Sequence, residues 1–370
     1  MLAKSCIVLF VFWLQWQAAV GQDMASLDGM TGPERLTWVR QYVDRELNQK
    51  DSVTAFKETN MLLDQAKKWD APELTAEVYG GQSRYLLEVR ADTAGARRIC
   101  EKGLDFALDY DLEVPAACLL LQKANICRRA NQSIRAYQYY SQAHEAFALA
   151  GFALVPRIDR YEYEMGRFLS ELGENKMALD HLSVANQFPG HSPQVRCEIF
   201  MLMASCSQKV TCAFQPMEYF HKCLQLAQKE NYIDKMVESS IGVGECHLQE
   251  GEFSEARIYL TTGYNWAEKD SQLYAAARAL ILLSKVNVQE GNLHAAAQKL
   301  TEAEGYIQRI NTKKLLSELY NGWMNIYESW DNYREAYRYR KLYDHLEDSI
   351  KSAALLQASA NIQLRLEARV

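Results

Sequence analysis

The chain has 370 residues, of which 48% are hydrophobic and 24% are charged, close to the average for globular proteins. That balance excludes a disordered chain and a polytopic membrane protein. The 18 Gly and 7 Pro are too few for the turns of a β-sandwich or barrel of this length, so the composition favours an all-α fold. The formal net charge is -6 and no block of basic residues occurs, which argues against nucleic acid as a partner.

The first 21 residues have the pattern of a targeting segment. Lys4 precedes an apolar run, Cys6–Trp16 (CIVLFVFWLQW), and the small residues Ala19 and Gly21 follow it. This pattern predicts a secretory signal peptide, residues 1–21, cleaved after Gly21. An uncleaved membrane anchor is the alternative, but a span needs about 20 apolar residues. We therefore expect an exported protein, periplasmic or secreted, with no membrane span in its mature chain.

An internal repeat of about 40 residues fills most of the remaining chain. The segments QEGEFSEA (Gln249–Ala256) and QEGNLHAA (Gln289–Ala296) carry the same pattern 40 positions apart. Extending their last alanine in both directions gives one marker position in each repeat. The markers are Ala55, Ala96, Ala136, Ala178, Pro216, Ala256, Ala296 and Ala336. Alanine accounts for only 43 of the 370 residues, so this periodicity is not an accident of composition.

Positions at fixed distances from each marker are also constrained. A large residue follows four positions later, as at Leu182 and Leu260, and small residues stand seven positions later and twelve earlier. Large apolar residues opposite small ones predict two antiparallel helices that approach closely. Gly173, Gly251 and Gly291 stand between the two helices, where glycine readily adopts the left-handed conformation that ends a helix.

This pattern resembles the tetratricopeptide repeat (TPR) family. Gly244, Gly251, Phe253, Ala256 and Leu260 match the family's order of small, turn and large residues, although its repeat has 34 residues and this one about 40. The resemblance implies an all-α, right-handed α-solenoid of about eight helix-turn-helix repeats over residues 22–345. It implies a non-enzymatic scaffold that binds a protein or peptide. The first repeat (residues 35–66) and the last repeat fit the pattern least well, as terminal repeats usually do.

The last segment, residues 346–370, is predicted as one amphipathic helix that caps or links the array. Its apolar side is expected to cover Trp330, Tyr333, Tyr337 and Tyr343. The ending YDHLEDSIKSAALLQASANIQLRLE resembles the segment after the last repeat of extracytoplasmic TPR sensors from Bacteroidetes. This resemblance implies the sensing region of a signal-transduction system. A stand-alone periplasmic or secreted scaffold for assembling other proteins is the alternative.

No constellation of residues indicates a catalytic, cofactor or metal site. The seven histidines fall on different predicted helices without metal-site spacing, and Gly242-Val243-Gly244 is explained by the repeat. Cysteines form no C-x-x-C motif; we expect them to be small buried side chains, with Cys206–Cys212 as the best local pair if a disulfide forms. Asp51-Ser52, Asp92-Thr93 and Asp348-Ser349 match either a short bacterial O-glycosylation pattern or helix N-caps.

The resemblance also predicts which residues face a partner. In TPR arrays the first helix of each pair lines the concave groove, at positions 18, 15 and 11 before the marker. This places in the groove the candidate partner-binding residues Asn125, Arg160, Tyr163, Arg167 and Ser205, and Arg128 lies just beyond them on its helix. The same rule adds Glu198, Met201, Glu238, Ile241, Glu245, Arg278, Ile281 and Lys285, with Gln208 and Lys209 just beyond. Arginine forks suit carboxylates, so we expect an acidic or carboxylate-bearing peptide. A solvated face held by local salt bridges is the alternative.

Overall fold

The computed structural model describes residues 26–152, 155–210 and 215–367, without the side chains of residue 45 and of residues 353–367. All regular structure in these ranges is helical. The predicted signal peptide and Cys212 lie outside the described residues. The chain divides into two compact units, Met1–Pro156 and Arg157–Val370, each described here by itself. The sequence predicted one continuous array; the division falls where Gly151 (φ 88°) follows α7 and Pro156 cannot continue a helix.

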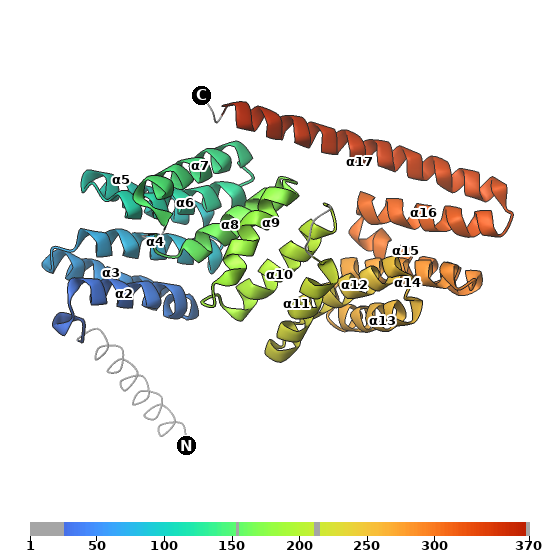
Figure 1. Ribbon diagram of the computed structural model, residues 1–370, viewed down its shortest axis with the longest axis horizontal. Coiled ribbons are helices and arrows are strands. Elements are labelled where there is room, and N and C mark those ends of the chain that lie inside the picture. Colours follow the sequence, from blue (N-terminus) through green and yellow to red (C-terminus); the bar gives the residue numbers. More distant parts are fainter. Residues whose placement is uncertain (1–25, 153–154, 211–214, 368–370) are drawn as a thin grey trace, which may run out of the picture. The chain divides into compact units, whose positions relative to one another are not determined.

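The first unit consists of helices that pack in sequence order (Figure 1). Its α-helices are α2 (Gly32–Gln41), α3 (Ser52–Lys68), α4 (Pro72–Glu88), α5 (Thr93–Asp109), α6 (Glu113–Arg129) and α7 (Ser133–Ala150). Three short helices, η1 (Leu27–Gly29), η2 (Tyr42–Glu46) and η3 (Leu47–Gln49), complete it. The poor fit of the first repeat has a structural counterpart here, because α2, a π-helical turn and a 3₁₀ turn replace its first helix.

The second unit continues the alternation of first and second helices. Its helices are α8 (Ile158–Glu171), α9 (Asn175–Gln187), α10 (Pro193–Ser207), α11 (Pro216–Glu230), α12 (Ile233–Glu250), α13 (Phe253–Lys269), α14 (Leu273–Gln289), α15 (Leu293–Ile310), α16 (Lys313–Ser329) and α17 (Tyr333–Glu367). Helices α8 to α17 pack as five antiparallel pairs, and each pair packs on the next. This architecture is the all-α TPR-type solenoid that the repeat predicted.

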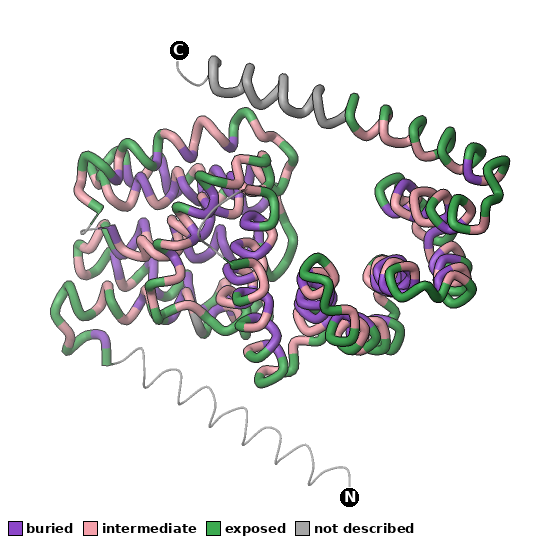
Figure 2. The backbone as a smooth tube through the Cα atoms, turned by 45° about the vertical axis from the view of Figure 1, so that its right-hand side comes forward, coloured by how far each residue is buried: buried purple, intermediate pink, exposed green. Residues whose placement is uncertain are grey.

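The marker alanines lie where the two helices of a pair touch. Ala96, Ala136, Ala178, Ala256 and Ala296 are each the fourth residue of a second helix and are fully buried. The predicted turn glycines Gly173, Gly251 and Gly291 have φ of 80°, 81° and 79°, so the left-handed helix ends are confirmed. Figure 2 shows the buried positions along the helix sides that face a neighbouring helix. Each hydrophobic cluster draws on a few successive helices, as expected of a solenoid.

The fifth repeat has a longer connection between its two helices. These are joined by residues 208–215, whereas only residues 251–252 separate α12 from α13. Pro216 is therefore the first residue of α11, while the other markers are fourth in their helices. The packing register itself continues, because Phe220, Cys223 and Ala227 are buried at the same distances after Pro216 as Leu260, Gly263 and Ala267 are after Ala256. Proline suits the first turn of a helix, where no backbone donor is required.

The C-terminal segment is not a separate helix. Residues 346–367 continue the second helix of the last repeat, so that α17 runs unbroken from Tyr333 to Glu367. A single helix cannot fold back over its own first turns. The expectation that the tail covers Tyr333 and Tyr337 was therefore wrong, and these side chains are 68% and 61% exposed.

Candidate functional site

A hollow of about 570 Å³ opens on the second unit where the first helices of consecutive repeats line up. The helices α8, α10 and α12 and the start of α14 form its walls. The lining residues are Arg167, Glu198, Met201, Leu202, Ser205, Gln208, Phe220, Lys235, Glu238, Ile241, Gln272, Leu273, Tyr274, Ala275 and Arg278. Its volume falls in the range of small-ligand and peptide side-chain sites.

The positional rule from the sequence places several side chains in this hollow. Of the candidate residues, Arg167 and Ser205 line it, and Arg160 and Tyr163 lie on the same helix, α8, as Arg167. The rule's further residues Glu198, Met201, Glu238, Ile241 and Arg278 also line it, as does Gln208 just beyond them. Seven of the fifteen lining residues come from this rule, whereas Glu245, Ile281 and Lys285, which the rule also selected, do not line the hollow.

The remaining two candidates, Asn125 and Arg128, belong to α6 of the first unit. Asn125 is only 4% exposed, and its side-chain oxygen accepts a hydrogen bond from the Tyr140 hydroxyl. This bond joins α6 to α7, so Asn125 contributes to packing within its own repeat and does not present its amide on a groove surface. Arg128 is half-buried on the same helix.

The arginines of α8 neutralise a buried carboxylate. Glu164 is 3% exposed; Arg167 binds its carboxylate directly, and Arg160 Nη2 lies 4.0 Å from it. The Arg167 Nη1 also donates to the Tyr163 hydroxyl at 3.0 Å, and that hydroxyl donates to Glu198. Burial raises the pKa of Tyr163 far above its ordinary value, so the phenol stays protonated and acts as donor. Local ion pairs, the alternative weighed from the sequence, therefore describe these two arginines.

The opposite wall carries two more cations, each near a carboxylate. Lys235 Nζ lies 3.4 Å from Glu238 and 3.5 Å from Asp234, and Arg278 binds Glu245. Burial by itself lowers the pKa of Lys235, but Glu238, Asp234 and Glu198 outweigh it and the pKa is raised. The ammonium group is thus charged at any physiological pH. The hollow contains both signs of charge and is not a purely basic patch.

An apolar floor lies between these charged walls. Met201 and Leu202 of α10, Phe220 of α11 and Ile241 of α12 line it. On one side stands the first turn of α14, whose N-cap Gln272 makes no side-chain capping bond. Such a helix start favours anions. The hollow therefore combines an apolar surface with groups that suit a carboxylate at its edge.

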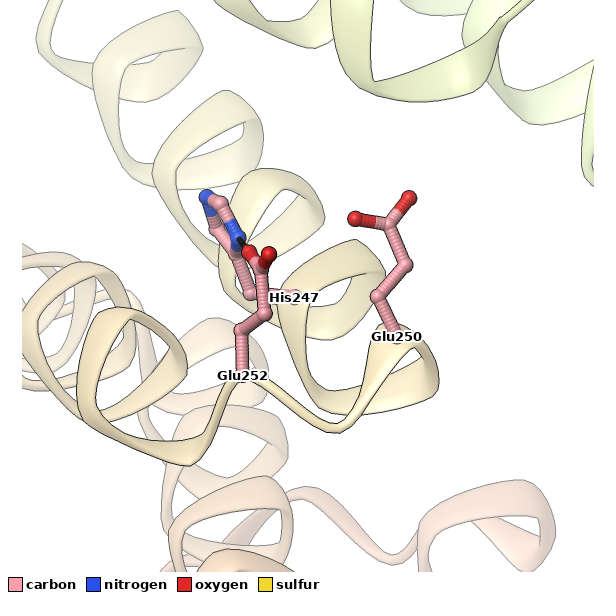
Figure 3. A group of neighbouring side chains, drawn as sticks. All are labelled: His247, Glu250 and Glu252. Atoms are coloured by element: carbon pink, nitrogen blue, oxygen red, sulfur yellow. Dashed lines mark hydrogen bonds and ion pairs between the residues drawn. The ribbon is translucent and has the colours of Figure 1, made fainter.

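A second group of side chains, at the turn between α12 and α13, was not predicted from the sequence. His247, Glu250 and Glu252 each offer a ligand atom, and these atoms lie within 4.8 Å of one another (Figure 3). His247 Nδ1 lies 2.6 Å from a carboxylate oxygen of Glu252. The spacing of the histidines alone does not reveal this group; the signal in the sequence is the His-x-x-Glu-x-Glu spacing across a predicted turn.

Comparison with known proteins supports the fold. No protein-family model and no curated protein matches the sequence. Among solved structures, a STAND protein with a tetratricopeptide repeat sensor from Pyrococcus horikoshii is similar with a TM-score of 0.57 and 13% identity, over 89% of this chain and 50% of that one. The apo quorum sensor NprR from B. thuringiensis is similar with a TM-score of 0.55 and 13% identity, over 85% of this chain and 99% of that one. A Rap protein complexed with competence and sporulation factor is similar with a TM-score of 0.53 and 13% identity, over 80% of this chain and 86% of that one.

These likenesses establish a TPR-type helical fold, and their identities are too low to say more. Within the described ranges, no helix has both the length and the apolar character that crossing a bilayer requires.

Proposed function

We propose that this protein is a non-enzymatic peptide-binding protein and that the hollow of its second unit takes the peptide. The main observation behind this proposal is the hollow, which has a volume of about 570 Å³ and is built by the first helices of consecutive repeats. A scaffold of packed helices is already ordered before binding, which limits the entropy lost on association to that of the peptide.

The walls indicate which parts of a peptide contribute most. Burying one large apolar side chain in this hollow, chiefly against the half-buried Met201 and Leu202, is worth about 1.5–3 kcal/mol. A partly exposed contact between a cation and a carboxylate is worth about 1 kcal/mol or less. The apolar contact therefore supplies most of the affinity. A carboxylate near Lys235, Arg278 and the start of α14 adds orientation and selectivity.

The proposed setting is outside the cytoplasm, with the peptide acting as a signal. The pattern of residues 1–21 supports export, and the likeness of the C-terminal segment to TPR sensors supports a sensing role. Two similar solved structures are described as a quorum sensor and as a complex with competence and sporulation factor. The same architecture thus exists in proteins described in those terms.

One experiment addresses both parts of the proposal. The full chain is expressed in a bacterium with a periplasm, and the intact mass of the exported protein is expected to begin at Gln22. Random peptides of about 12 residues are then selected on this protein by phage display. Enriched peptides are expected to share a large apolar residue followed by an acidic residue or a free C-terminus, and to bind less tightly at high salt.

Ser205→Trp is the informative variant. The Ser205 hydroxyl donates only within its own helix, to Met201 O at 2.6 Å, so its loss disturbs no contact between helices. The indole fills the hollow, and we expect the selected peptide to bind at least about tenfold more weakly, a loss of about 1.4 kcal/mol. Ile258→Ala is the matched control, since Ile258 is 64% exposed on α13 and does not line the hollow.

Equal peptide affinity for wild type and Ser205→Trp, with unchanged melting of both, would reject the hollow as the binding site. Retention of residues 1–21 in a membrane fraction would reject export. Replacing Arg160 and Arg167 together by glutamate is a poor test, because it would leave the buried Glu164 carboxylate among like charges and destabilise the fold.

A further inference from the structure

We propose that the turn between α12 and α13 binds a divalent transition-metal cation of the zinc class through His247, Glu250 and Glu252. Their ligand atoms, one imidazole nitrogen and two carboxylate oxygens, already lie within 4.8 Å of one another. In Figure 3 the three side chains rise from the same turn toward a shared space. The site is separate from the hollow and does not depend on the proposed peptide.

The backbone brings the three residues together. Glu250 is the last residue of α12, Gly251 reverses the chain in the left-handed conformation (φ 81°), and Glu252 is the N-cap of α13. The Glu252 N–H donates to His247 O at 2.9 Å, which holds the start of α13 against the last turn of α12. The His247 ring stacks on Tyr259 with centroids 5.5 Å apart and planes 12° apart. The imidazole is therefore held in place before any metal arrives.

The corresponding turns of other repeats show which side chains contact the positions of His247, Glu250 and Glu252. Forty residues on, Asn287, Glu290 and Asn292 stand where His247, Glu250 and Glu252 stand here. There Arg257 of α13 donates to Asn287 Oδ1 at 3.0 Å and binds Glu290. In the first unit, Arg97 of α5 likewise donates to Gln132 of the next turn at 3.1 Å. At these turns an arginine from the preceding second helix supplies the positive charge.

At the α12–α13 turn no arginine takes this place. The preceding second helix, α11, brings His221, whose ring centroid lies 6.4 Å from that of His247 and 5.6 Å from that of Tyr259. In the described part of the chain, the Glu250 carboxylate accepts no hydrogen bond and forms no ion pair. The Glu250 and Glu252 carboxylates thus face a space that an arginine side chain occupies at the next turn, between α14 and α15.

The ligand set selects the class of metal. Calcium and magnesium prefer oxygen ligands only, whereas imidazole with carboxylate suits zinc and its neighbours among the divalent transition metals. Ligand atoms around a tetrahedral zinc at about 2.0 Å are about 3.3 Å apart. Glu250 and Glu252 are exposed, so rotation of their side chains can close the set to that spacing. Solvent, or the nearby His221, completes the coordination.

The test is titration of the chelator-treated full chain with zinc chloride by calorimetry, with cobalt(II) absorption as an independent report of coordination. We expect wild type to bind one equivalent that is absent from both His247→Ala and Glu252→Gln. Glu290→Gln, in the next turn, is the matched control and should retain that equivalent. Circular dichroism checks that each variant keeps its helical content, as expected for changes at an exposed turn.

Three results would overturn the proposal. The first is wild-type zinc stoichiometry and affinity in both His247→Ala and Glu252→Gln. The second is binding of calcium without binding of zinc, which would contradict the assigned metal class. The third is loss of the zinc equivalent in Glu290→Gln as well, which would show that the effect is not specific to this turn.

Discussion

At the scale of single residues, small side chains decide how closely the helices approach. A Cβ atom added to Gly244 would lie 2.7 Å from Leu260 Cγ and 3.1 Å from the Leu260 backbone nitrogen. A Cβ atom added to Gly166 would meet Leu182 in the same way, at 2.7 Å. These are the pairs of small and large positions that the repeat pattern predicted. Glycine is required there because two helices cross at that point.

Gly244→Ala should therefore destabilise the second unit by about 1–3 kcal/mol, the usual cost of overpacking a close contact. Gly305→Ala is its control, because Gly305 lies inside α15 and an added Cβ would meet nothing within 4 Å. There alanine should stabilise the protein by about 0.4–1 kcal/mol by restricting the unfolded chain. Urea denaturation measures both changes. Equal effects from the two substitutions would contradict the packing argument.

Two aspartates with alternative readings in the sequence have a clear structural role. Asp51 is the N-cap of α3 and accepts hydrogen bonds from the backbone N–H groups of Val53 and Thr54. Asp92 is the N-cap of α5 and accepts from Gly95 at 2.8 Å. The N-cap interpretation is thus confirmed for both, but it was wrong for Asp348, which lies inside α17. Each such cap contributes about 1 kcal/mol to helix stability.

At the scale of elements, α17 is positioned by an aromatic cluster rather than by a folded-back tail. Tyr339 contacts Tyr320, Trp323 and Tyr327 of α16, with ring centroids 5.8, 6.0 and 5.6 Å apart. Further along α17, the Glu347 carboxylate accepts a hydrogen bond from the Ser317 hydroxyl at 2.6 Å, and the Lys313 ammonium group donates one to the Ser349 hydroxyl at 2.9 Å. These contacts extend the packing of α17 on α16 as far as Ser349.

We expect Tyr339→Ala to lower the free energy of unfolding by about 1–3 kcal/mol, since it removes half-buried aromatic area and three ring contacts. Tyr337→Ala, two residues earlier on the same helix, should change it by less than about 0.5 kcal/mol because Tyr337 is 61% exposed. Chemical denaturation followed by circular dichroism measures both changes. A smaller effect for Tyr339 than for Tyr337 would show that the cluster does not anchor α17.

At the scale of the whole molecule, the chain forms two compact units, each with its own buried clusters. In a solenoid each helix pair buries its apolar side only against neighbouring pairs. Stability is therefore local, and each unit has the core needed to unfold as a unit of its own. A single melting temperature would not describe such a protein.

Calorimetry is expected to resolve two transitions with different pH dependence. His191 and His221 are both in the second unit, and burial lowers the pKa of each despite Asp159 beside His191. A group whose pKa is lowered by folding stabilises the native state above its ordinary pKa of about 6.5, and this stabilisation is lost as the pH falls. Between pH 7.5 and 5.5 the transition of the second unit should fall by about 2–4 °C for each kcal/mol lost.

His191→Gln should reduce that pH dependence, and the assignment of the transition is checked with Gly244→Ala, which should shift the same transition. A first-unit transition that moves as much as the second over this pH range would contradict the attribution to these histidines.

The sequence by itself determined the fold class and the repeat, because a 40-residue period of small and large side chains is a local pattern that predicts pairs of helices. Gly251 could be placed from spacing alone, whereas Arg167 and Ser205 were placed in the groove through the resemblance to TPR arrays. Tertiary structure decided what depends on contacts between repeats. The period does not reveal that Asn125 binds Tyr140 or that the α8 arginines neutralise Glu164. It also does not reveal that His221 of α11 lies beside His247 of α12. It also does not set the length of a connection, and so the late start of α11 at Pro216 and the division at Pro156 were not predicted. Position along a repeat identifies the face of the helix on which a side chain lies. Its partner belongs to another helix, and only the packed structure shows which residue, of which charge and size, lies opposite.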